Sequence, residues 1–358
     1  MEKVNKNSFI YFNVYQFGDI LFNENKNKIF EKIIDLNKDN PNENNILSEL
    51  IIEKYNIIND YICLCFLIGN DFLPHIPGID ISNNSINDLL NIYVDIFSIR
   101  QKHLVEDFKI NFIFIKQIIT RLYSNEYIYL KDYQKKIDRF RPFFKGANQK
   151  IDIELKRLNY YPIFNKNRKI NYFSENWKYE YYNYYFNIKN EKINSSDINN
   201  ICNNYIEGLQ WNLKYYLIDC PSFSWYYQYR AAPLLKDLTK YLLNRVYPKD
   251  FNNQIEYTPL EQLAIVLPKE SEYLWSDNYR HKVKSDIKLQ GFYPIDYKID
   301  TVNKIYLHQC EPILMNIDDI YIRNVFKDIE LNNFEKKRIE ITGLKIYYDT
   351  SENIKIKY

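Results

Sequence analysis

One segment of this 358-residue chain places a carboxylate where it could do chemistry. Residues 61–81 read YICLCFLIGNDFLPHIPGIDI, an apolar run that ends at Gly69 and is followed by Asn70 and Asp71. An Asp directly after a glycine-terminated buried helix is held at the end of that helix, so we expect Asp71 to lie beside the core rather than in open solvent. A carboxylate held there is suited to coordinate a hard divalent cation. The alternative interpretation is an Asx-type turn or a helix cap, which Asn and Asp both favour.

The other side chains with catalytic potential do not form a recognisable local motif. The sequence contains neither a Gly-rich phosphate loop nor a local Ser/His/Asp signature. His75 follows Asp71 by four residues, and a lone histidine is more often a structural hydrogen-bond donor than a ligand. The five cysteines lack the Cys-x-x-Cys spacing of a zinc site; they are Cys63, Cys65, Cys202, Cys220 and Cys310.

The composition limits the class of protein without identifying a function. The chain has 48 Lys+Arg against 46 Asp+Glu, and this net charge of +2 argues against a basic tail while leaving room for a local basic groove. Asn, Ile, Lys, Tyr and Phe are abundant and have A/T-rich codons, so we interpret their excess as the bias of an A/T-rich genome. We find no signal peptide and no run of about 18 apolar residues. We therefore expect an intracellular protein, in the cytoplasm or the nucleus, without a membrane partner.

Apolar spacing predicts helices on both sides of the candidate carboxylate and along most of the chain. Apolar residues recur every three or four positions over 46–68, and Gly69 is expected to end that helix. Residues 258–261, Thr-Pro-Leu-Glu, form a capping box that opens a short helix to about 267. Three further helices are expected: 85–101 with Asn83, Asn84 or Ser85 as N-cap, one that begins near Asn111, and a long one that begins at Ser195 or Ser196.

Three stretches depart from the helical pattern. Residues 140–175 carry Pro142, Gly146 and Pro162 and are predicted to be irregular, so we place a candidate domain boundary there. The Asn-rich residues 35–46 are interpreted as a solvated loop insertion. Short alternating stretches after residue 292, such as 345–348, predict strands near the C-terminus.

The segment GNDFLPHIPGIDI resembles the signature of the 5′→3′ exoribonuclease (XRN) family, and later segments resemble that family in the same order along the chain. A single short motif could arise by chance, whereas six in order over most of residues 8–330 identify a homologue. The later segments are His103–Val105 with Lys109–Phe112, Trp177–Tyr182, Tyr205–Trp211, Cys220–Tyr227, and Pro259–Leu263 with Val266–Pro268 and Phe292–Pro294.

The resemblance implies a mainly α fold. It predicts the multi-helical XRN-type helical domain, preceded by a remnant of the α/β nuclease domain (PIN/FEN-like) and followed by short strands near the C-terminus. The corresponding division is 1–82 for the end of the nuclease domain with the Gly-Asn-Asp motif, 83–330 for the helical domain with an irregular stretch at about 140–175, and 331–358 for a C-terminal tail.

The resemblance also implies roles for three residues. Asp71 matches a catalytic divalent-metal ligand of the family, and the expected cofactor is Mg²⁺ or Mn²⁺. Trp225 is similar to the aromatic residue that stacks on the 5′-terminal base of RNA, and the alternative is a core Trp. Arg230 replaces a histidine of the family pattern, and Phe223 replaces a tryptophan. Arg230 brings a permanent positive charge that would contact either an RNA phosphate or a nearby acidic side chain.

Two functional interpretations remain open. Two-metal phosphodiester hydrolysis needs several carboxylates, and most of those in the family belong to an N-terminal half that we expect to lie outside this chain. The spacing of Asp80, Asp88 and Asp95 does not rebuild such a cluster. In the first interpretation the chain is part of a 5′→3′ exoribonuclease that degrades single-stranded 5′-monophosphate RNA, as in mRNA decay, and it needs an N-terminal nuclease half from a separate chain. In the second it is a non-catalytic RNA-binding or scaffold module. An unrelated helical structural protein is disfavoured by the ordered motifs.

Overall fold

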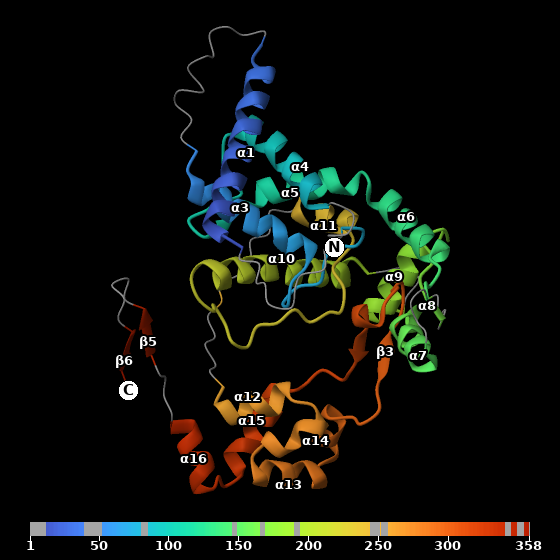
Figure 1. The fold of residues 1–358 in the computed structure, drawn as a ribbon, viewed down its shortest axis with the longest axis vertical. Coiled ribbons are helices and arrows are strands. Elements are labelled where there is room, and N and C mark those ends of the chain that lie inside the picture. The colour runs from blue at the N-terminus through green and yellow to red at the C-terminus, as the bar shows by residue number, and fades with distance from the viewer. Residues whose placement is uncertain are drawn as a thin grey trace. The chain divides into compact units, whose positions relative to one another are not determined.

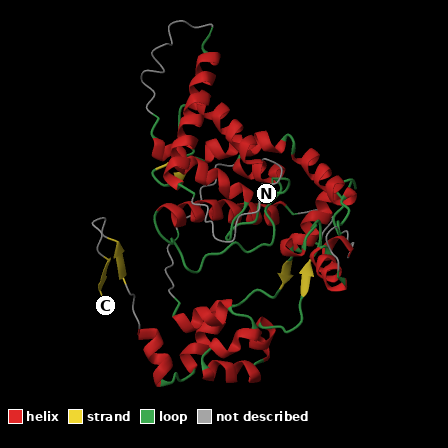
Figure 2. Ribbon diagram, in the orientation of Figure 1, coloured by secondary structure: helices red, strands yellow, loops and turns green. Residues whose placement is uncertain are grey.

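The computed structural model describes residues 12–38, 52–79, 85–144, 149–164, 169–189, 194–243, 251, 257–340, 345–348 and 354–357. Helices dominate it, with a few short strands, so the predicted mainly α class is confirmed (Figure 2). The chain forms two compact units, which are described one at a time. Unit 1 comprises Met1–Arg141 and Arg168–Gln254, and unit 2 comprises Pro142–Asn167 and Ile255–Tyr358.

Unit 1 is a helical bundle that carries the candidate site. Helix α1 packs on α3 and α4, α5 packs on α4 and α11, and α10 packs on α3, α11 and a short hairpin (Figure 1). One continuous apolar core joins these elements. Their bounds are α1 Val14–Leu36, α3 Lys54–Cys65, η2 Phe66–Ile68, α4 Ser85–Arg100, β1 Val105–Glu106, β2 Lys109–Ile110, α5 Phe112–Tyr123, α6 Glu126–Arg139, α9 Trp177–Phe186, α10 Ser195–Leu217 and α11 Leu235–Leu242.

Local sequence signals explain where several of these helices begin and end. Gly69 has a φ of +94° after the last turn of η2, and a Cβ there would lie 2.7 Å from the backbone nitrogen of His75, so glycine is required. The Asn111 side chain accepts a hydrogen bond from the Phe114 amide at 3.1 Å and caps α5. Ser195 is the first residue of α10, and Asn194 is its cap. These helices were predicted, and the described residues confirm them.

Parts of two predictions fall outside the described residues. Helix α3 is described from Lys54, so the expected first turns at 46–51 and most of the Asn-rich stretch are not covered. Asn83 and Asn84, two of the proposed caps of α4, are likewise outside, and Ser85 is the first residue of that helix.

The prediction of an irregular stretch over 140–175 is partly wrong. Helices α7, Lys150–Asn159, and α8, Tyr161–Phe164, lie inside it. The Asp152 carboxylate accepts a hydrogen bond from the Gln149 amide at 3.3 Å and thereby caps the start of α7. The glycine and prolines that suggested irregularity mostly flank these helices rather than interrupt them. Two of the three junctions between the units fall within this stretch, after residues 141 and 167, and the third follows residue 254.

The predicted division at residues 82 and 330 does not coincide with a boundary between compact units. Helices α1 and α3 pack against α4 across residue 82 and share one core with it. Helix α15, Asp319–Asp328, packs against α12, and α16, Asn333–Glu340, packs against the same helix from the other side of residue 330 in the chain.

Unit 2 is built from short helices around a small aromatic core. Its helix α12, Pro259–Val266, begins at the predicted capping box: the Glu261 carboxylate accepts from the Thr258 amide at 2.7 Å, and the Thr258 hydroxyl accepts from the Glu261 amide at 3.3 Å. Strand β5, Lys345–Tyr348, confirms the predicted strand and pairs antiparallel with β6, Ile354–Lys357. The other elements are η4 Lys269–Leu274, α13 Asp277–Ser285, α14 Ile287–Phe292, η5 Leu307–Gln309, and the antiparallel pair β3 Lys298–Asp300 and β4 Glu311–Ile313.

No helix of the described residues is both long enough and apolar enough to cross a membrane.

Candidate nucleic-acid interface

The loop that carries Asp71 is closed by its neighbour Asn70. The Asn70 side-chain oxygen accepts hydrogen bonds from the backbone amides of Phe72 and Leu73, both at 2.9 Å. The backbone amide of Asn70 donates to the Leu73 carbonyl at 3.0 Å. This is the Asx-type turn that the sequence left as an alternative, and Asn70 rather than Asp71 forms it. The turn leaves Asp71 at the apex of the loop.

Asp71 is exposed to solvent, which corrects the expectation that it lies beside the core. The physical reason is the partner on α10: the side-chain nitrogen of Asn70 donates to the Asn212 side-chain oxygen at 3.0 Å. An ionised carboxylate accepts hydrogen bonds and cannot donate one, so the inward position suits the amide and the outward position suits Asp71.

Asn212 holds the loop from inside the bundle. Its side chain is completely buried, and its nitrogen donates to the Gly208 carbonyl of the preceding turn of α10 at 2.9 Å. Because a buried amide that loses its partners costs free energy, this link fixes the Asp71 loop against α10. The sequence analysis missed Asn212; the available signal was a polar residue inside the otherwise apolar face of a long predicted helix.

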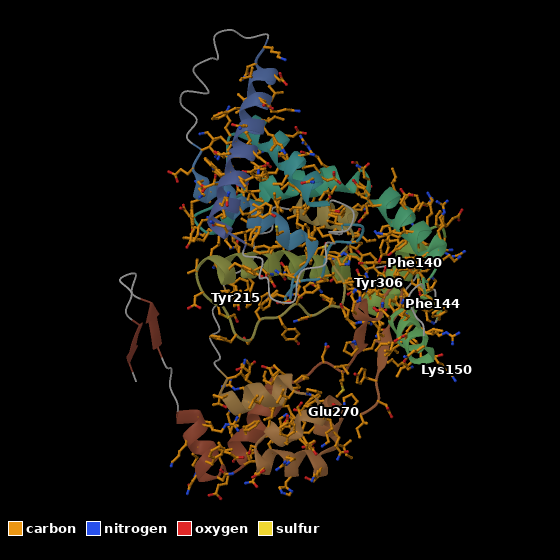
Figure 3. The ribbon with its side chains drawn as sticks, viewed as in Figure 1. Phe140, Phe144, Lys150, Tyr215, Glu270 and Tyr306 are labelled. Atoms are coloured by element: carbon orange, nitrogen blue, oxygen red, sulfur yellow. The ribbon has the colours of Figure 1, made fainter. Side chains whose placement is uncertain are left out.

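Four aromatic rings pack together next to Asp71. The Phe72 ring lies 4.9 Å from the Trp211 ring and 4.8 Å from the Tyr215 ring, measured between centroids. Trp211 stacks on Tyr215 at 5.1 Å with an interplanar angle of 10°, and on Trp225 at 5.4 Å with an angle of 24°. We call Trp225, Trp211 and Tyr215 the aromatic column. Figure 3 labels Tyr215 on α10. The column brings predicted Trp225 together with two rings for which the sequence analysis proposed no role.

Trp225 belongs both to the column and to the core. Its ring is partly buried and packs against the main core of unit 1. Gly208 permits this close approach, because a Cβ at that position would lie 2.8 Å from Trp225. The Trp225 indole nitrogen is buried and has no hydrogen-bond partner among the described residues. The structure therefore combines features of both interpretations of Trp225.

Arg230 makes a contact that the sequence analysis did not consider. Its guanidinium lies over the ring of Tyr184 in α9, 5.8 Å from the centroid, in a cation–π contact. Tyr184 is not part of the aromatic column. Phe223, the replacement for a family tryptophan, is half exposed.

Asp71 presents one exposed carboxylate, which alone does not make a metal site. The described residues contain no group of three or more His, Cys, Asp and Glu side chains that could hold a metal ion. Asp95 instead forms ion pairs with Lys32 at 2.9 Å and with Arg121 at 3.2 Å, and Asp80 lies outside the described residues. The His75 ring nitrogen Nδ1 lies 3.1 Å from the Ile76 carbonyl oxygen, a structural contact.

Other family-like segments support the scaffold around the site. Buried Asp60 accepts hydrogen bonds from the Tyr93 hydroxyl at 2.6 Å and from the Val105 amide at 2.7 Å, and its carboxylate lies 2.7 Å from Nδ1 of His103. Gln210 of α10 bonds the hairpin through the Ile110 amide at 3.0 Å. These contacts explain why the His-Leu-Val segment and the α10 motif occur together.

A second buried acid joins α6 to α11. The Glu126 carboxylate accepts hydrogen bonds from the amides of Leu235 at 2.5 Å and Lys236 at 3.3 Å at the start of α11. Burial raises the pKa of Glu126 from 4.5 to about 7 in spite of these backbone donors, which favour the ionised form.

Comparisons with known proteins agree with the motif series. The family model described as the Xrn1 helical domain matches residues 52–170 and 164–355, a range that includes the Asp71 loop and the aromatic column. Similar curated proteins are a 5′-3′ exoribonuclease 2 homolog of Drosophila melanogaster, 24% identical over 73% of this chain, and human 5′-3′ exoribonuclease 1, 24% identical over 83% of this chain. Yeast 5′-3′ exoribonuclease 1 is 30% identical over 53% of the chain.

The matched region is a limited part of each relative. The chain covers 33% of the Drosophila protein, 19% of the human protein and 12% of the yeast protein. The family model nevertheless accounts for most of the residues of this chain. The chain therefore belongs to the XRN family, and the part of that family which it contains is the Xrn1 helical domain.

Proposed function

We propose that this chain is part of a 5′→3′ exoribonuclease that degrades single-stranded 5′-monophosphate RNA inside the cell. One observation carries the proposal. Phe72, the residue next to Asp71, contacts both Trp211 and Tyr215, so a carboxylate and an aromatic stacking surface lie side by side. Base–aromatic stacking tolerates every base, which suits an enzyme that digests RNA regardless of sequence.

Asp71 would serve as a ligand of the divalent cation, Mg²⁺ or Mn²⁺. A pair of such ions supplies an activated water and stabilises the charge on the attacking and leaving oxygens, and it requires several carboxylates. The exposed carboxylate of Asp71 offers one oxygen donor, and the Asn70 turn holds it outward for this purpose. We propose that the remaining acidic ligands come from an N-terminal XRN nuclease half.

The roles of Trp225 and Arg230 follow from the same proposal. Trp225 supports the 5′-terminal base through the aromatic column, and its contact with Trp211 holds the ring in place. Arg230 supplies a permanent cation for an RNA phosphate, while the Tyr184 ring orients the guanidinium.

The test compares the purified chain with the chain reconstituted with an N-terminal XRN nuclease half. We expect the chain alone to bind 5′-monophosphate RNA without degrading it, and the reconstituted enzyme to degrade it in the presence of Mg²⁺. Asp71→Ala should lower turnover by about a hundredfold or more, because metal-held charge stabilisation is worth several kcal/mol. RNA affinity should stay unchanged. Undiminished turnover of the Asp71→Ala enzyme would remove Asp71 from the site.

The second candidate function is a non-catalytic RNA-binding or scaffold module. The observation that favours it is the lack, among the described residues, of any group of three potential metal ligands. The same experiment separates the two candidates. A chain that binds RNA but gives no activity with any nuclease half would support the module, whereas restored activity would exclude it.

A further inference from the structure

The most accessible ring of the aromatic column is Tyr215 rather than Trp225. Trp211, at the centre, is only 4% exposed, and Tyr215 in the last turns of α10 is 42% exposed. Trp225 is partly buried against the core of unit 1. Since a base can stack only on a ring surface that it can reach, the end of the column at Tyr215 offers more stacking surface than the end at Trp225.

Among the described residues, the other rings that contact Tyr215 lie beside it rather than in line with the column. The centroids of Phe72, Trp211 and Tyr215 form a nearly equilateral triangle, with sides of 4.8, 4.9 and 5.1 Å, so Phe72 is beside the stack and not in line with it. Tyr216 meets Tyr215 edge to face at 5.8 Å and packs on Phe66 at 5.3 Å. Consecutive helix residues point in different directions, so Tyr216 does not continue the column.

Positive charge lies near the Trp225 end of the column. The Lys214 ammonium is 5.7 Å from the centroid of the Phe251 ring, and Phe251 meets Trp225 edge to face at 6.1 Å. A cation beside a stack of nearly parallel rings complements a planar aromatic group that is attached to a phosphate. A stacking surface with a nearby cation matches the base and the phosphate of a single-stranded RNA nucleotide better than it matches an aliphatic protein segment.

We propose that Tyr215 is a second base-stacking position. Its outer surface receives an unpaired nucleobase of single-stranded RNA, and Trp211 holds the Tyr215 ring in the required orientation through the 10° stack. This inference rests on the proposed function, because it takes single-stranded RNA as the ligand. It assigns a stacking role to a residue for which the sequence analysis proposed none.

The test measures the affinity of the full chain for a fluorescently labelled oligoadenylate and for an oligonucleotide of the same length with abasic sugars. Both are measured with a chelator present to prevent hydrolysis. Tyr215→Leu keeps apolar packing over Trp211 and removes the aromatic face. We expect it to weaken oligoadenylate binding by about 5- to 30-fold and to leave abasic binding unchanged. Tyr215→Phe should bind like the wild type.

The matched control is Tyr216→Leu, which alters the next residue of α10, with a side chain that is 50% exposed. It should leave oligoadenylate affinity within about twofold of the wild type. Circular dichroism and thermal unfolding of each variant verify that the fold is retained, and Tyr215→Phe provides a test that does not depend on the stability of Tyr215→Leu.

Three outcomes would overturn the inference. If Tyr215→Leu binds oligoadenylate like the wild type while Trp225→Ala binds it more weakly, the Tyr215 position is wrong and the proposed function stands. If Tyr215→Leu weakens abasic binding as much as oligoadenylate binding, Tyr215 contributes packing and does not stack on a base. If the wild-type chain binds neither oligonucleotide, the proposed function and the inference both fail.

Discussion

Two aromatic clusters of this chain contrast in what their rings are free to do. In unit 2, the Trp275 ring lies 5.8 Å from the Tyr279 ring and 4.3 Å from the Tyr293 ring, and the three side chains are at most 5% exposed. The Tyr279 and Tyr293 hydroxyls bond each other at 2.7 Å, and Tyr293 also donates to the Ala264 carbonyl at 2.6 Å. The three rings are almost completely buried, and both hydroxyls bond within the protein. This cluster is a core.

The aromatic column of unit 1 has similar ring types but a different environment. It reaches the surface at Tyr215, and Phe72 places it next to the exposed carboxylate of Asp71. Phe, Trp and Tyr make up 17% of the residues of this chain, so aromatic content alone does not distinguish a binding surface from a core. Exposure of a stacked ring beside a charged group makes the distinction.

The largest expected effect concerns the core of unit 2. Trp275→Ala should destabilise unit 2 by about 3–5 kcal/mol, because it removes a large buried side chain and leaves a cavity. Chemical unfolding measured by circular dichroism checks this loss. The control is Tyr273→Ala, which truncates a ring that is 70% exposed and should change stability by no more than about 0.5 kcal/mol. Equal stabilities of the two variants would mean that the contrast between buried and exposed rings is wrong.

The next largest effect is the pH dependence of the stability of unit 1. The pKa of Glu126 in the folded state is about 7, above the ordinary value of 4.5. Between pH 4.5 and pH 7, Glu126 is therefore protonated in the folded state and ionised in the unfolded state. The stability of unit 1 is therefore expected to fall as the pH rises from 4.5 to 7. The upper bound of this loss is about 3 kcal/mol.

Glu126→Gln tests this pH dependence, since the amide oxygen still accepts from the Leu235 amide but does not titrate. Denaturant unfolding of unit 1 followed at several pH values should show a flatter profile for the variant than for the wild type. A wild-type profile with the same slope as the variant would refute the role of Glu126.

A smaller effect concerns the link between the Asp71 loop and the column. Asn212→Ala leaves the Asn70 side-chain nitrogen without its partner and should cost about 1–3 kcal/mol. Hydrogen exchange of the Phe72 and Leu73 amides should become faster, because the turn that protects them loses its anchor. The control is Asn204→Ala on the same helix, whose side chain accepts from the Gln228 amide at 2.9 Å, away from the loop. If the Phe72 and Leu73 amides exchange at the same rate in Asn212→Ala as in the wild type, the loop keeps its conformation without Asn212.

Much of the fold could be predicted from short-range patterns. Asn111 and Thr258 marked the starts of α5 and α12, because a capping side chain bonds backbone amides within three residues. Helix α7 was missed, because Gly146 and Pro162 were given more weight than the ten residues of the helix, Lys150–Asn159, that lie between them. Its apolar residues Ile151, Leu155 and Leu158 follow helical spacing, and none of the side chains of the helix is buried in the structure.

The candidate site could be predicted only in part. Asp71 and Trp225 were found through motifs, whereas Asn212 and Tyr215 were not singled out. Their importance rests on contacts with Asn70 and Phe72, in a loop that lies far away along the chain; the Asn70–Asn212 pair is separated by 142 residues. No local pattern carries that information.

The sequence by itself determined the family, the helical class and the residue types available for chemistry, because these depend on motif order and on local periodicity. Only the tertiary structure decided which side chains face the solvent. It turned Asn70 inward and Asp71 outward, because a buried amide partner needs a hydrogen-bond donor that a carboxylate lacks. It also stacked Trp225 on Trp211 of α10, because the approach of the Trp225 segment to Gly208 depends on how α10 packs in the finished bundle.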